Sequence, residues 1–188
     1  DDILFINRDL TAALAANEAV TTVFVTAGDA GRNGAYWQGR EDGARAAYAS
    51  RTGETEWINT TANIVIGCTS FQIATSYLAG RPEVRLYFLR VADGYEGGGT
   101  AAYDGESLQK LWNGEIPSMH SVDGENTYSR ADLTGILTTL MEMHEADNIL
   151  TLDFASAYSR AQDHSDHRHA ARFATLASQN YEAEHNIE

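Results

Sequence analysis

The chain has 188 residues, 43% of them hydrophobic, and 27 acidic against 13 basic side chains give a formal net charge of −14. A chain of this length can bury a hydrophobic core that is stable without disulfides or a structural metal. The single cysteine, Cys68, excludes an internal disulfide and a cysteine-rich zinc module. The charge argues against nucleic acid and anionic membranes as partners, and no apolar run is long enough to span a membrane. We expect one globular domain over residues 1–188, with Cys68 buried as a small apolar side chain.

The first half of the chain alternates helical and strand patterns. Residues 8–17 are rich in Ala and Leu, as in a helix, and residues 20–27 are almost continuously β-branched and apolar, as in a buried parallel strand. A turn is predicted over 28–31, followed by a helix over 39–48. Further strands are predicted over 63–67, 70–78 and 84–91, the last two forming a β-hairpin.

The second half begins with a loop over residues 93–105 that contains five glycines. Loops of this length in compact domains are usually functional, and we expect this one to form a rim or lid. The remaining patterns predict helices over 107–112, 129–145 and 166–180, with Ser107 as an N-cap, and a short buried strand over 149–153.

This order of elements predicts an α/β, layered, Rossmann-like fold with a mainly parallel sheet flanked by helices, plus a β-hairpin. Residues 1–7 resemble the junction that follows a strand, so we expect the first strand to be missing and the chain to be trimmed at both ends. Ligands of such sheets bind outside the carboxyl ends of the parallel strands. The polar positions predicted there are Asp1–Asp2, Gly28–Asp29, residues 90–94 and Asp153 with the segment that follows.

Three of the six histidines lie within residues 163–169. His164 and His167 are three residues apart, so both can face one side of a helix start, with Asp166 between them. Imidazole is a good zinc ligand, and a carboxylate can orient it. Asp1 or Asp2 is the obvious source of an acidic ligand. The alternative is a solvated helix start, with Asp166 placed near the N-terminus for the helix dipole; His169 is expected on the surface.

Six stretches, in order, resemble the PIG-L/LmbE-like family of zinc-dependent N-acetylglucosamine de-N-acetylases. The resemblance extends over nearly the whole chain. The stretches are residues 1–7, 25–31, 36–43, 84–94, 107–114 and 163–167.

The resemblance implies roles for both ends of the chain. Asp1 matches a zinc ligand and Asp2 the third acidic residue of the family's first motif, which we count among the catalytic residues. In this register the family's histidine ligand and general base would precede residue 1; an alternative register makes Asp1 the base and Asp2 the ligand. His167 matches a zinc ligand. His164 matches the residue that assists the transition state or protonates the leaving amine, and Asp166 matches the residue that orients His164.

The resemblance also implies a substrate crevice. Arg40 matches an arginine that contacts substrate in relatives, Gly28 and Asp29 would line the same crevice, and Asp93 would hold a sugar hydroxyl. Trp37 is the aromatic residue that we expect to stack on a sugar ring.

The expected function is a Zn²⁺-dependent hydrolase that removes the N-acetyl group from an N-acetylated amino sugar or glycoconjugate. A metal-activated water attacks the amide and acetate is released. The alternatives are a non-catalytic carbohydrate-binding or structural relative on the same scaffold, and a zinc hydrolase of another amide. Acidity, low cysteine content and the resemblance favour a secreted protein, with a cytoplasmic location as the alternative.

Overall fold

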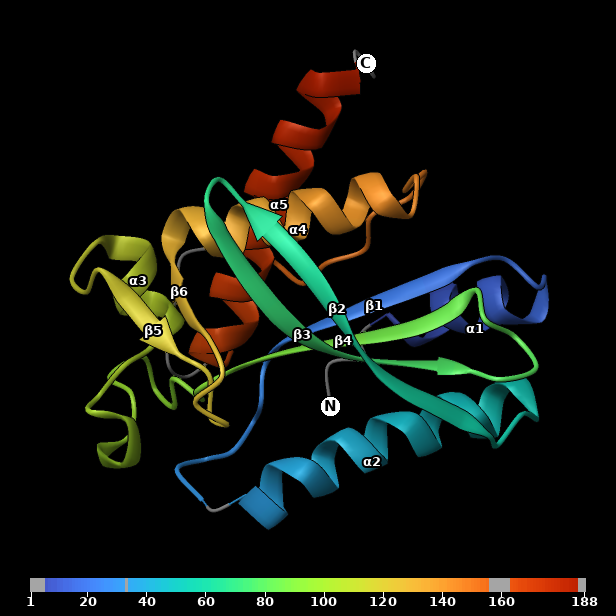
Figure 1. Ribbon diagram of the computed structural model, residues 1–188, viewed down its shortest axis with the longest axis horizontal. Helices are drawn as coiled ribbons and strands as arrows, with labels where there is room; N and C mark the ends of the chain where they lie inside the picture. Colours follow the sequence, from blue (N-terminus) through green and yellow to red (C-terminus); the bar gives the residue numbers. More distant parts are fainter. Residues whose placement is uncertain (1–5, 33, 156–162, 186–188) are drawn as a thin grey trace.

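The computed structural model describes residues 6–32, 34–155 and 163–185, and its helices and strands follow most of the predicted pattern (Figure 1). The predicted helix over 39–48 is longer at both ends, and Gly53, with a φ of +77°, follows it. The elements are α1 (Asn7–Ala15), β1 (Val20–Thr26), α2 (Gly34–Thr52), β2 (Trp57–Ile66), β3 (Thr69–Leu78), β4 (Val84–Val91), η2 (Ala101–Tyr103), α3 (Leu108–Asn113), β5 (Ser118–His120), β6 (Thr127–Ser129), α4 (Arg130–Met143) and α5 (Ser165–His185).

The main sheet is mostly antiparallel, so the prediction of a mainly parallel sheet is wrong. Its strand order is β1-β4-β3-β2, and only β1 and β4 run parallel. The connections explain this, because two residues join β2 to β3 and five join β3 to β4, and such short links can only connect antiparallel strands. The predicted hairpin between β3 and β4 is confirmed. Cys68 lies in the tight turn between β2 and β3 and is exposed, so its predicted burial is also wrong.

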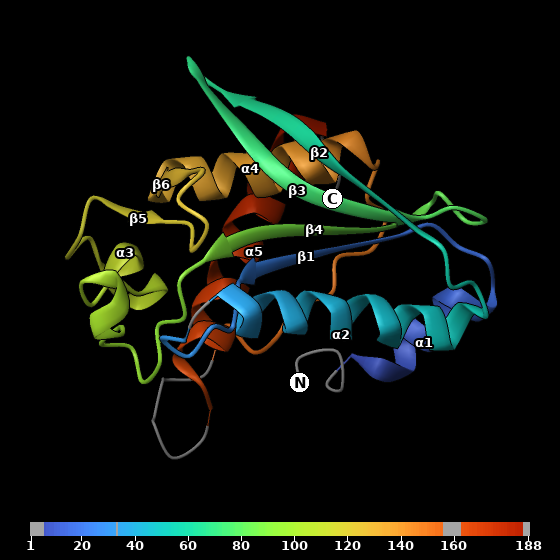
Figure 2. The same cartoon turned by 60° about the horizontal axis from the view of Figure 1, so that its bottom comes forward.

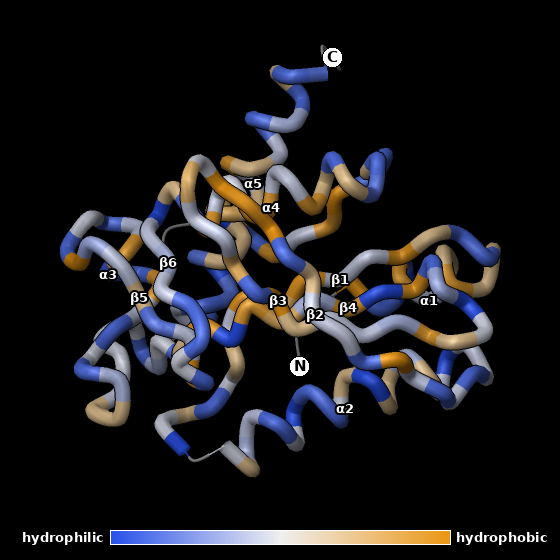
Figure 3. The backbone as a smooth tube through the Cα atoms, viewed as in Figure 1, coloured by the Kyte–Doolittle hydropathy of each residue, from blue (hydrophilic) through white to orange (hydrophobic). Residues whose placement is uncertain are grey.

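Helices cover both faces of the sheet, with α1 and α2 on one side and α4 and α5 on the other (Figures 1 and 2). Side chains of β4 alternate between the two faces. Val84, Leu86 and Phe88 pack with α1 and α2, whereas Tyr87 and Leu89 pack with α3, α4 and α5. This alternation gives β4 the continuous hydrophobic character of a central strand. The apolar stretches of the chain accordingly lie along the strands and the inner side of α4 (Figure 3).

The predicted strand over 149–153 is absent. These residues are irregular and pair with no described strand, and Leu150 is 52% exposed. A five-residue apolar run does not by itself reveal whether a neighbouring strand offers it hydrogen bonds. In the described part of the chain, no helix has the length and apolar character needed to cross a membrane.

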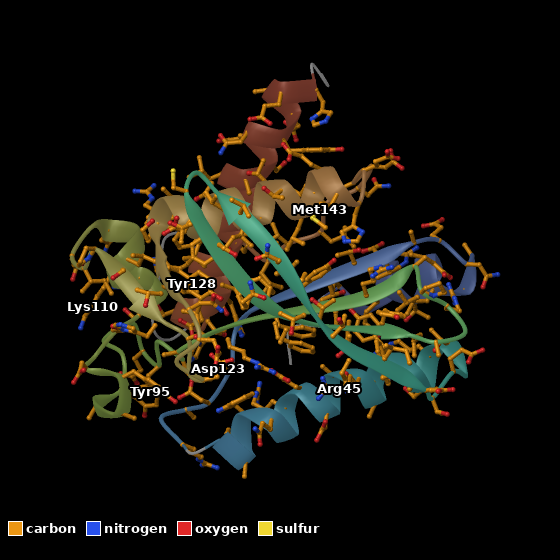
Figure 4. The ribbon with its side chains drawn as sticks, viewed as in Figure 1. Arg45, Tyr95, Lys110, Asp123, Tyr128 and Met143 are labelled. Carbon is orange, nitrogen blue, oxygen red and sulfur yellow. The ribbon has the colours of Figure 1, made fainter. Side chains whose placement is uncertain are left out.

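A bulge in β4 sets the direction of the chain as it leaves the sheet. Between the pairs Phe24–Phe88 and Thr26–Val91, β4 has one more residue than β1, and Arg90 adopts a φ of +58°. The Arg90 guanidinium donates to Glu41 over 2.7 and 3.0 Å and to Asp123, labelled in Figure 4, over 2.8 Å. These ion pairs tie the bulge to α2 and to the β5–β6 turn.

Candidate active site

The carboxyl ends of β1 and β4 meet at one edge of the sheet, as predicted for Asp29 and Asp93. Asp29 is fully buried, and its carboxylate accepts hydrogen bonds from the backbone N–H groups of Asp93 (2.7 Å) and Gly31 (2.8 Å). Both carboxylate oxygens of Asp29 are therefore used to hold the two loops together. This geometry makes Asp29 a support for Asp93.

The start of α5 brings Asp166 against the same edge. One carboxylate oxygen, Oδ2, accepts from the Gly94 backbone N–H at 2.9 Å, whereas Oδ1 has no hydrogen-bond partner among the described residues. The residue is only 5% exposed. A side chain at position 94 would collide with Oδ1, so glycine allows this close approach.

Burial raises the pKa of the Asp166 carboxyl from 3.8 to about 8. The nearby charges of Asp93 and Asp29 raise this pKa further, while the hydrogen bond from Gly94 lowers it. A buried carboxylate with an unpartnered oxygen is unfavourable unless a cation compensates its charge. The site therefore has the chemical character of a cation site.

Asp93, His164 and Asp166 form a cluster whose ligand-capable atoms all lie within 4.8 Å of one another, so these residues can hold a metal ion. His164 Nε2 lies 3.8 Å from Asp93 Oδ1, and His164 Nδ1 lies 3.9 Å from Asp166 Oδ2. Nδ1 accepts a hydrogen bond from the Asp166 backbone N–H at 3.2 Å, which places the proton of the neutral ring on Nε2.

His167 lies beside His164, with ring centroids 5.5 Å apart, so the two side chains share one side of the helix start as predicted. His167 Nδ1 is 2.7 Å from Asp163 Oδ1. A carboxylate on one ring nitrogen is the usual support of a metal-binding imidazole. The sequence reasoning gave no role to Asp163, although its i, i+4 spacing from His167 was the available signal.

His169 is buried, so its predicted surface position is wrong. Its Nδ1 is 2.7 Å from the carbonyl oxygen of Ser165, and burial lowers the pKa of the imidazole. Ser165 in turn donates to Gln109 of α3 at 2.9 Å. These two interactions fix the first turn of α5, which carries Asp166 and directly follows His164.

The glycine-rich loop is fastened to α3 beside the cluster. The Ser107 hydroxyl donates to the Gly97 carbonyl at 2.6 Å, and Ser107 also caps α3, as predicted. Lys110 donates to the carbonyls of Gly98 (2.9 Å) and Gly105 (2.7 Å). With Gly94 bonded to Asp166, the loop borders the cluster at the position expected of a rim.

The predicted substrate residues fall into two groups. Gly28 and Arg40 lie together, because a Cβ on Gly28 would be 2.5 Å from Arg40 Nε. Trp37 is only 6% exposed, and the Arg90 guanidinium lies 4.8 Å from its ring centroid. The indole of Trp37 therefore packs against Arg90, and its role in sugar stacking stays a prediction. Asp1 and Asp2 lie outside the described residues.

The chain matches the family described as PIG-L, GlcNAc-PI de-N-acetylase over residues 1–178. No curated protein and no solved structure matches it. The matched region contains all six stretches on which the resemblance rests, including the histidine cluster. On the strength of this match, the chain belongs to the PIG-L family of GlcNAc-PI de-N-acetylases.

Proposed function

We propose that the protein is a zinc-dependent hydrolase that removes the acetyl group from an N-acetylated amino sugar or its glycoconjugate. Family membership supports the de-N-acetylase reaction. The observation that carries the metal requirement is the buried Asp166 carboxylate, whose Oδ1 has no partner among the described residues and lies in a cluster with Asp93 and His164.

The neighbourhood of Asp166 fits a divalent cation. When bound, zinc supplies a Lewis acid that polarises the amide carbonyl and acidifies a water molecule. Asp166 and Asp93 supply carboxylate oxygens, and His167 supplies an imidazole whose other nitrogen is supported by Asp163. Because burial keeps Asp166 protonated near neutral pH, metal binding should release a proton from this carboxyl.

The hydrogen bonds favour different roles for the two histidines. His164 Nδ1 accepts the Asp166 backbone N–H, so the neutral ring carries its proton on Nε2, which lies 3.8 Å from Asp93 Oδ1. To act as an acid the ring must first gain a second proton on Nδ1, where the Asp166 carboxylate oxygen Oδ2, 3.9 Å away, can replace the backbone N–H as partner; Nε2 then gives its proton to the leaving amine and the ring returns to the neutral form. We therefore assign His164 as the proton donor, although its place in the cluster also permits metal binding. In the alternative register of the family's first motif, Asp1 is the base that takes the proton of the attacking water.

The test measures bound zinc and acetate release on the same preparations. Wild-type protein is dialysed against a weak chelator, zinc is counted by elemental mass spectrometry, and acetate released from N-acetylglucosamine oligosaccharides is quantified. We expect about one zinc per chain and release of acetate. His167→Ala should lose both zinc and activity. His164→Ala should keep zinc and lose most activity, roughly the 10²–10⁴-fold contribution of a general acid.

His120→Ala is the matched control, because His120 is an exposed histidine paired with Glu106 and lies outside the cluster. It should retain both zinc and activity. Loss of zinc from His164→Ala would make His164 a ligand and overturn its assignment as the proton donor. Sugar binding without acetate release by the zinc-loaded wild type would contradict the hydrolase and identify a carbohydrate-binding relative.

A further inference from the structure

Tyr95 has a backbone conformation that its side chain disfavours. Its φ is +51°, in the left-handed region, which is uncommon for a bulky residue. The loop around it is rich in glycine, a residue that adopts this conformation without strain. A tyrosine at this position therefore requires a compensating interaction of its backbone or its ring.

The backbone of Tyr95 is bound directly to the candidate site. Its N–H donates to Asp93 Oδ1 at 2.6 Å, and the same oxygen lies 3.8 Å from His164 Nε2. Asp93 is held in turn by Asp29. Tyr95 thus lies two residues after Asp93 in the chain, on the loop between β4 and α3 (Figure 4).

Packing against the described residues does not explain the strained conformation. Tyr95 is 57% exposed, and no ring contact of its side chain is found among the described residues. A glycine would keep the backbone hydrogen bond to Asp93 and remove the strain. Such a glycine would lack only the exposed aromatic ring that Tyr95 presents on this loop.

We propose that Tyr95 determines substrate specificity by stacking its ring on a pyranose ring of the substrate. The inference rests on the proposed function and narrows its substrate class. Tyr and Trp rings offer a flat apolar face with a polar edge, which suits a sugar ring. The aromatic residue expected from the sequence, Trp37, is buried beneath Arg90, whereas Tyr95 is exposed and its backbone is bound to Asp93 of the cluster.

The charges around Tyr95 indicate which sugars fit. Asp93 lies on its loop and accepts the Tyr95 N–H, and without a bound cation its carboxylate repels anions. A neutral N-acetylhexosamine should therefore bind the metal-free protein more tightly than the same sugar carrying a sulfate.

The test compares Tyr95→Gly with Tyr95→Phe and with Glu145→Gly. Glu145 is exposed, has a φ of +48° and follows α4, so its glycine variant makes the same backbone change away from the site. The substrates are N-acetylglucosamine trimer and the same trimer carrying a 6-sulfate. Steady-state kinetics of the zinc-loaded protein give kcat and KM, and an NMR titration of the metal-free protein with the trimer gives Kd.

Tyr95→Gly should raise KM and Kd for the neutral trimer roughly three- to tenfold, the effect of losing one aromatic contact, while kcat stays within about twofold. Tyr95→Phe and Glu145→Gly should match wild type, and the sulfated trimer should bind more weakly than the neutral one. Unchanged KM and Kd in Tyr95→Gly, or a fall in kcat alone, would overturn the stacking role while the hydrolase stands. A wild type that binds the trimer in a Tyr95-dependent way without releasing acetate would support the stacking and refute the hydrolase. Absence of both binding and hydrolysis in the wild type would refute both.

Discussion

Asp166 should make the metal-free protein less stable as the pH rises, and Asp166→Asn should remove this effect. The folded protein raises the pKa of this carboxyl from 3.8 to about 8, chiefly through burial. The folded state therefore holds the proton more tightly than the unfolded state, so the free energy of unfolding is highest below pH 3.8. It then falls as the pH rises from 3.8 to about 8, where the folded carboxyl ionises.

The size of the effect follows from the same shift. Each pH unit in this range costs about 1.4 kcal/mol, so wild type should lose roughly 2–4 kcal/mol relative to Asp166→Asn between pH 4 and pH 7. The asparagine oxygen can still accept the Gly94 N–H. Its NH₂ group replaces the unpartnered Oδ1 at a cost of about 1–3 kcal/mol that is independent of pH. The variant should be the less stable protein at pH 4 and the equal or more stable one at pH 7.

The assay is urea unfolding of both proteins in EDTA at unit steps from pH 4 to pH 8. Taking the difference between the two proteins cancels the other titrating groups, provided that the m-values agree. Asp166→Asn should also bind less zinc and lose activity, because it replaces a carboxylate ligand by a neutral amide. A stability difference that stays constant across this pH range would refute the argument, because the folded site would then impose no penalty on the charged carboxylate.

Three further changes test the supports of the site. Asp29→Asn should destabilise the protein by about 2–3 kcal/mol in urea unfolding, because one amide oxygen cannot replace the two carboxylate oxygens that accept the backbone N–H groups of Gly31 and Asp93. A variant as stable as the wild type would show that these two hydrogen bonds contribute nothing to stability. Gly99→Ala should lower the stability by about 2 kcal/mol or more in thermal unfolding, because φ is +73° and the new Cβ would overlap backbone atoms of residues 105 and 106. Gly98→Ala, where the new Cβ meets open space, should be nearly neutral, and equal effects of the two changes would contradict the close approach at Gly99. Arg90→Met should lower stability by about 1–3 kcal/mol and reduce kcat/KM, because Glu41 and Asp123 lose their cationic partner and the bulge before Asp93 loses its ion pairs. An active, fully stable variant would show that other contacts hold the bulge.

Local pattern was sufficient for most helices and strands, and for the neighbours within one short segment. The apolar periodicity located α4, the residue types located the caps, and the His164–His167 spacing placed both rings on one side of α5. The turn residues after β1 and β4 predicted that Asp29 and Asp93 would meet, because these two strands are parallel. The β3–β4 hairpin was predicted from its turn residues, whereas the expectation of a mainly parallel sheet was wrong because a two-residue turn also makes β2 antiparallel to β3.

The sequence by itself determined the α/β class, the order of most elements and the family, because these depend on local propensity and on motifs within short stretches, whereas the short strands β5 and β6 were not predicted. Only the tertiary structure decided what each polar side chain does. Burial raises the pKa of the Asp166 carboxyl, and packing under the Arg90 guanidinium removes Trp37 from the surface. The backbone N–H of Tyr95 is bound to Asp93, and its side chain is exposed. Solvation and distance between residues far apart in the chain set these properties, and neither is encoded in the spacing of residues along it.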